Sequence, residues 1–115
     1  MQYAMMIYAE AGYAEELPEA EREAVRAEFA ALTDDVRYIA AAQLQPVETA
    51  TCVRVVVGRT LMTDGPFADT KEVLGGIVLV EAANLDEVLE MAARIPVTRH
   101  GGVVEIRPVV AVVAR

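Results

Sequence analysis

The sequence predicts an α+β domain in which two helices cover one face of an antiparallel sheet. Three observations support this fold class. The 115 residues are the usual size of one domain with one core, and we expect residues 1–115 to form a single domain. Short apolar runs rich in valine, isoleucine and tyrosine are typical of strands. Two longer stretches repeat apolar residues every three or four positions, as amphipathic helices do.

The first strand and the first helix follow from the opening third of the chain. Residues 3–9 form a short apolar run that Gly12 ends, which is typical of a buried strand. From Pro18 to about Ala42 the apolar spacing predicts one long helix, and proline suits its first turn. The apolar positions of this helix are Val25, Phe29, Leu32, Val36 and Ile39.

The middle of the chain predicts a hairpin followed by a shaped loop. Residues 51–57 and 60–63 are apolar runs joined by Gly58-Arg59, which is typical of a hairpin with a two-residue turn. The segment Thr63–Glu72 then indicates a loop, because glycine and proline in Asp64-Gly65-Pro66 end a strand.

The last third supplies a strand, a helix and a final strand. Residues 77–82 form a β-branched run, and Asn84 is the expected cap of a helix that Pro96 ends. Residues 103–107 form the last strand. The complete order is β-α-β-β-α-β with an inserted hairpin, which is the order of a ferredoxin-like fold with two helices on one face of the sheet.

The second face of this sheet also requires burial. Residues 77–80 are apolar at every position, whereas two helices can cover only one face. We expect a second copy of the chain to cover the other face, because two-fold homodimers are the commonest oligomers. The alternative is that the C-terminal segment 109–113 folds back over it.

The charge and composition disfavour several classes of protein. The net charge of −8 would repel a nucleic-acid backbone, so we expect no nucleic-acid partner. No apolar run reaches the ~18 residues of a membrane helix, and the N-terminus lacks the basic region of a signal peptide. These features favour a cytoplasmic protein without a membrane partner. The single cysteine, Cys52, forms no internal disulfide and is expected in a buried strand position.

The chain also lacks the motifs of common cofactor and nucleophile sites. One histidine and one cysteine cannot form a zinc-type cluster, although carboxylate-only metal sites stay open. No Gly-rich phosphate motif is present, and the chain contains no serine to act as a nucleophile. We therefore expect no cofactor.

Two segments carry a resemblance to a known family. These are Thr63–Glu72 with the glycine pair after it, and Ile95-Pro96 with the later run Arg99–Pro108. Together they resemble the YCII-related family, in its DGPF branch, over nearly the whole chain. The resemblance implies a dimeric α/β barrel but no established reaction. The branch is often associated with extracytoplasmic-function sigma factors, so the resemblance also implies a transcription regulator as a possible partner. A related branch is thought to use a His–Asp pair near the first helix, where this chain has no histidine.

Four residues are candidates for acid–base chemistry. Asp64 is either a turn residue or a base. Lys71 is the only lysine beside nine arginines, and it either pairs with Glu72 or Asp69 or contacts a ligand, as Glu72 also could. His100, the only histidine, is either a solvated loop residue or an acid–base group.

Four further residues are candidates for ligand binding. Phe67 either anchors the loop to the core or forms a pocket wall. Arg99 lies beside the histidine, and Glu105 and Arg107 share one strand face, where they form a surface pair or line a dimer cavity. Two functions stay open: binding of an unknown small molecule in a dimer cavity, or cofactor-free isomerase or lyase chemistry on a small, aromatic-type ligand.

Overall fold

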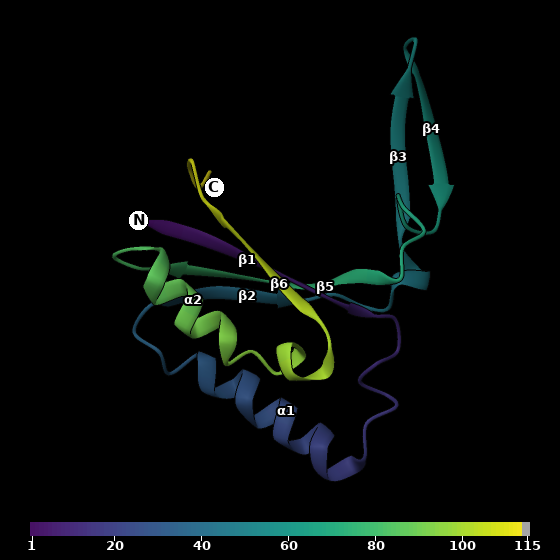
Figure 1. Cartoon of the computed structure of the whole chain (residues 1–115). Coiled ribbons are helices and arrows are strands. Elements are labelled where there is room, and N and C mark those ends of the chain that lie inside the picture. The colour runs from purple at the N-terminus through teal and green to yellow at the C-terminus, as the bar shows by residue number, and fades with distance from the viewer. Residues whose placement is uncertain (114–115) are drawn as a thin grey trace.

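The computed structural model describes residues 1–113. These residues form two α-helices, six strands and two short 3-10 helices. Figure 1 shows these elements along the chain. Their bounds are β1 (Gln2–Glu10), α1 (Glu19–Leu32), β2 (Tyr38–Gln43), η1 (Val47–Thr49), β3 (Thr51–Val56), β4 (Arg59–Asp64), β5 (Glu72–Glu81), α2 (Leu85–Ala93), η2 (Pro96–His100) and β6 (Val103–Pro108).

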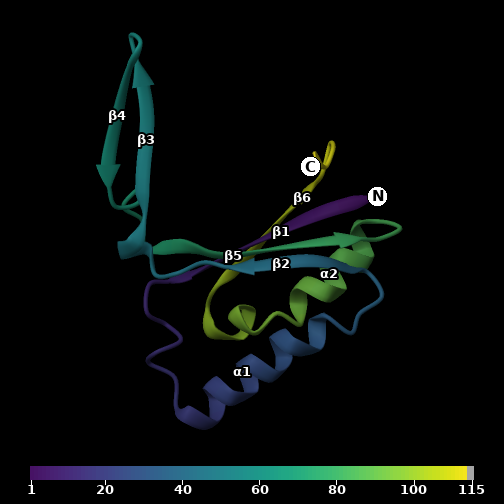
Figure 2. The same ribbon diagram turned by 180° about the vertical axis from the view of Figure 1, so that it is seen from behind.

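Four strands form one antiparallel sheet in the order β2-β5-β1-β6, and β3 pairs only with β4 in a separate hairpin. Both helices lie on one side of the four-stranded sheet (Figures 1 and 2). The predicted α+β class is therefore confirmed, and the arrangement is compatible with a ferredoxin-like fold. None of the described helices has the length and hydropathy needed to cross a membrane.

The first helix is shorter than the sequence pattern predicts. It ends at Leu32, and residues 38–43, expected to be helical, form strand β2. The turn between them is held by Asp35, whose carboxylate accepts hydrogen bonds from the backbone N–H and the guanidinium of Arg37 at 2.9 Å. Val36 continues the apolar spacing but is 98% exposed. The apolar period thus runs past the true end of the helix, and the second main strand was missed.

Strand β5 is longer than predicted and includes part of the expected loop. It begins at Glu72 rather than after the glycine pair, so residues 72–76 are strand and Asp64 is the last residue of β4. Gly76 permits the close pairing of β5 with β2, because a Cβ atom there would lie 3.2 Å from the carbonyl oxygen of Ala42. The connecting loop therefore covers only residues 65–71.

The main core lies between the sheet and α2. Alternate residues of β1 and β5 point to the helices and are buried, as strand geometry requires. Helix α2 starts at the predicted cap, since the Asn84 side-chain oxygen accepts a hydrogen bond from the backbone N–H of Glu87 at 3.1 Å. The largest fully buried residues are Met5, Val78, Val80, Val88, Met91, Ile95, Pro96 and Val97.

The opposite face of the sheet is open. We define this open face by the strand residues that alternate with the core: Ala4, Met6, Ile77, Leu79, Glu105 and Arg107. The alternative cover, segment 109–113, does not lie over it, because Val110 and Val113 are almost fully exposed. Within residues 1–113 this face has no helix on it (Figure 2).

Candidate functional site

A groove lies between α1 and the strand β2. Only Val25 and Leu32 of this helix are buried, and residues 39–43 of β2 are exposed even where they face the helix. The space between them has a volume of about 730 Å³. Unlike α2, therefore, α1 does not close down on the sheet, and the gap that is left forms this cavity.

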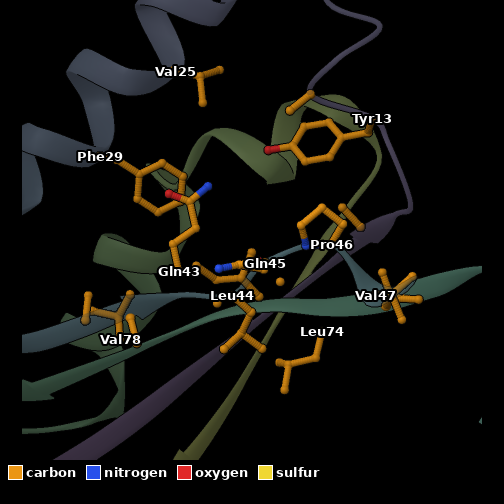
Figure 3. Close-up of a pocket in the computed structure, with 18 of the residues that line it drawn as sticks. Tyr13, Val25, Phe29, Gln43, Leu44, Gln45, Pro46, Val47, Leu74 and Val78 are labelled. Carbon is orange, nitrogen blue, oxygen red and sulfur yellow. The ribbon is translucent and has the colours of Figure 1, made fainter. Parts of the chain in front are cut away.

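The walls of the groove are mainly apolar. Figure 3 shows Val25 and Phe29 on the helix side, Gln43 and Leu44 on the strand side, and Tyr13 at one end. The floor includes two small residues, which leave space beneath the helix because alanine has only a methyl group and glycine has no side chain. The floor residues are Ile7, Ala41, Gly76 and Val78.

Tyr13 supplies a phenol to this apolar space. Burial raises its pKa, with the positive charge of Arg99 acting in the opposite direction as a smaller effect. The hydroxyl group therefore stays protonated at neutral pH and is available as a hydrogen-bond donor. The Tyr13 ring lies beside His100, with the two ring centroids 6.2 Å apart.

A charged cluster fixes this end of the groove. The Nε2 atom of His100 lies 3.0 Å from Oε1 of Glu21, and Arg99 donates to the same oxygen from Nε at 3.1 Å and from Nη2 at 2.6 Å. These bonds lower the pKa of the Glu21 carboxyl, that from Arg99 most strongly. Arg99 also pairs with Glu28, so the turn η2 is tied to α1 at two points. The cluster therefore holds His100 in place beside the Tyr13 ring.

The predicted acid–base residues lie on separate elements. Asp64 ends β4, and His100 is in η2 against Glu21 of α1. Lys71 is the last residue of the loop, and Glu72 is the first residue of β5. The lysine Nζ pairs with Oε1 of Glu10 at 3.1 Å rather than with either expected partner. Glu72 keeps one buried oxygen, Oε2, with no hydrogen-bond partner among the described residues.

The predicted ligand-binding residues are also dispersed. Phe67 is 80% exposed, and the guanidinium carbon of Arg54 lies 5.6 Å from its ring centroid, so the ring packs on the hairpin rather than on the main core. Arg99 belongs to the cluster on α1. Glu105 and Arg107 form an ion pair at 2.9 Å on the open face. Cys52 is half-buried, not buried, and its thiol donates to the carbonyl of Gly65 at 3.2 Å.

The groove residues were not found from the sequence. Tyr13 comes from a loop, Phe29 from a helix and Gln43 from the strand that was missed. The pairing of Glu21 with His100 joins positions 79 residues apart, and no local motif signals it. Among residues 1–113 no group of three or more histidine, cysteine or acidic side chains is gathered as a metal site.

Comparison with known proteins places the chain in a family. A family model for the YCII-related domain matches residues 1–113. The chain belongs to the YCII-related family. The chain is also similar to an uncharacterized protein of Rhizobium meliloti (strain 1021), to which it is 41% identical over 68 residues. Those residues are 58% of this chain and 55% of the relative, so the match spans about half the length of that protein.

Proposed function

We propose that this YCII-related protein binds a small, mainly apolar molecule in the groove between α1 and β2. The observation that carries this proposal is the cavity of about 730 Å³ with apolar walls and a protonated phenol at one end. Small-molecule sites typically measure roughly 300 to 1,000 Å³ and combine apolar walls with a few polar groups. Tyr13 and the amide of Gln43 are the polar groups that would orient the ligand.

The charges around the groove favour a neutral or cationic ligand. Glu10, Glu15 and Glu48 line it, and the whole chain carries −8. Glu10 is paired with Lys71, so Glu15 and Glu48 contribute most of the negative charge at the lining. The one arginine among the lining residues, Arg26, is already paired with Glu23 and Glu19 on its own helix. An anionic ligand would therefore meet acidic side chains, and no unpaired cation among the described lining residues would balance its charge.

We also propose that the open faces of two copies pack together in a homodimer. The chain exposes 8134 Å², whereas a compact monomer of 12.4 kDa exposes about 6,100 Å². The excess is of the size that stable homodimers bury.

We assign the chain to the DGPF branch on its Asp64–Phe67 tetrapeptide, and a transcription regulator is the proposed partner of the dimer.

A second candidate function is proton transfer to the bound ligand. The observation that favours it is the placement of Tyr13 on the groove, with His100 beside its ring and Glu21 paired with His100. Asp64 does not line the groove, so any such chemistry would use Tyr13 rather than the residues of the hairpin. Turnover of a bound ligand that is lost in Tyr13→Phe while binding persists would establish this second function.

A dye titration tests the binding proposal. The neutral dye N-phenylnaphthylamine should fluoresce on binding, and its anionic relative anilinonaphthalenesulfonate should bind more weakly because of the acidic lining. The variant Ala41→Phe fills the groove floor and should weaken binding of the neutral dye by about tenfold or more, a loss of about 1.4 kcal/mol. Ala27→Phe, on the exposed side of α1, is the matched control and should bind as the wild type does.

Equal dye binding by Ala41→Phe and the wild type would contradict the groove as the binding site. Circular dichroism of both variants shows that each retains the fold, so that a loss of binding in Ala41→Phe is not a loss of structure. Tighter binding of the anionic dye than of the neutral dye would contradict the proposed preference for neutral or cationic ligands.

A further inference from the structure

The hairpin β3–β4 stands outside the body of the domain. We call residues 51–64 the arm. The arm rises from one end of the four-stranded sheet, on the side away from the helices, and pairs with no strand of that sheet (Figures 1 and 2). The radius of gyration is 16.0 Å, whereas a compact chain of this length has about 13 Å. An isolated two-stranded hairpin is at best marginally stable in water, so the arm requires a partner surface.

One face of the arm is apolar and bare. Val53 lies opposite Met62 in the hairpin register, and Val55 follows two residues along the same face. These side chains are 67%, 76% and 66% exposed, respectively. No described element of the chain covers them, and a patch of this kind on a monomer usually marks an interaction site.

The tip of the arm adds a second unusual feature. Val57 has a φ of +48° and Gly58 a φ of +74°, as in a hairpin turn that favours asparagine and glycine. A β-branched residue is rarely found at positive φ, and Val57 is also 94% exposed. The chain therefore keeps a strained apolar residue at the tip, and packing within residues 1–113 offsets little of the strain because the side chain is almost fully exposed.

We propose that the arm packs its Val53, Val55 and Met62 face against a second copy of this chain, clasping the flank of the partner. This inference rests on the proposed dimer. The arm and the open face lie on the same side of one chain (Figure 1), and both present apolar side chains that no described element covers. A two-fold axis would give each copy both surfaces at once. The excess exposed area of about 2,000 Å² per chain suits a dimer that buries both.

Geometry and charge indicate where the arm meets the partner. Six strand residues span about 20 Å, whereas packed sheets lie only about 10 Å apart, so the arm reaches past the partner's sheet to its flank. The arm contains two arginines and one aspartate and carries +1, whereas the whole chain carries −8. The arm of one copy and the body of another are thus complementary in charge.

Photo-crosslinking and sedimentation test the contact. With the photoreactive residue benzoylphenylalanine at position 55, illumination of the full chain should give a covalent dimer, and the same residue at exposed position 36 should not. The variant Val55→Glu should weaken dimerisation by about tenfold or more in sedimentation equilibrium, because the acidic side chain meets an acidic partner. Val36→Glu is the matched control and should leave the dimer unchanged.

The outcomes separate the arm from the dimer itself. The arm contact would be overturned if Val55→Glu leaves the dimer's dissociation constant unchanged and benzoylphenylalanine at position 55 or 62 gives no crosslink. The proposed sheet-to-sheet dimer would not be affected by that result. A sedimentation mass equal to one chain would overturn both. Leu79→Glu on the open face should dissociate the dimer whether or not the arm contributes, which tests the proposed sheet contact separately.

Discussion

At the scale of single residues, Asp35 determines where the first helix ends and the sheet resumes. Its side chain is 13% exposed, and it accepts hydrogen bonds from Arg37 and from Arg94, which belongs to the far end of the chain. These bonds hold the pKa of the carboxyl well below its ordinary value, those from Arg37 most strongly. The charged form of this residue therefore stabilises the folded state.

Asp35→Asn should lower the free energy of unfolding by about 2 kcal/mol at neutral pH, because several hydrogen bonds to a charged group are weakened. The sign of the pH dependence follows from the lowered pKa. The stabilisation is present above the unfolded pKa of about 3.9 and is lost as the pH falls toward the folded value. Urea unfolding at neutral and acidic pH measures it.

Asp34→Asn is the matched control, since this neighbouring residue is exposed. It should change stability by less than about 0.5 kcal/mol. If Asp35→Asn loses as much stability on acidification as the wild type, the assigned role of Asp35 is wrong.

The motif residues Lys71 and Asp64 lie on separate elements, which shows why a sequence motif does not by itself define a site.

At the scale of elements, the arm is held in a strained form at its tip. Val57→Asn should relieve this strain, because asparagine adopts positive φ angles more readily than valine does. The free energy needed to open the arm should then rise by about 1 kcal/mol, and its backbone amides should exchange with solvent about fivefold more slowly. Hydrogen exchange measured by mass spectrometry on peptides covering residues 51–64 tests this. Unchanged or faster exchange in the variant would contradict the reading of the tip.

Secondary structure was predictable where local chemistry and apolar spacing agree. Helix α2 carries its own start and stop signals, Asn84 and Pro96, and the structure has the predicted cap. The first helix had no stop signal strong enough to end the apolar period, and Asp35 acts through contacts with Arg37 and the distant Arg94. Strand β2 has three alanines and only one β-branched residue, Ile39, so its own strand signal is weak.

At the scale of the whole molecule, the sequence predicted the α+β class and the single covered face, but not the groove. The groove exists because α1 stands off from a strand of small residues, which is a matter of tertiary packing rather than of motif. Its lining comes from α1, η1, the strands β1, β2 and β5, and the loop that carries Tyr13. The cluster of Glu21, Arg99 and His100 joins residues 78 and 79 positions apart. Such contacts become visible only in the folded chain.

The central claim is that the groove between α1 and β2 is the ligand site. The most direct test is a titration of isotope-labelled protein with N-phenylnaphthylamine, followed by backbone amide chemical shifts in nuclear magnetic resonance spectra. We expect the largest shift changes at Tyr13, Phe29, Ala41, Gln43 and Gly76, which line the groove. Shift changes confined to the open face or to the arm, with none at these five residues, would contradict it.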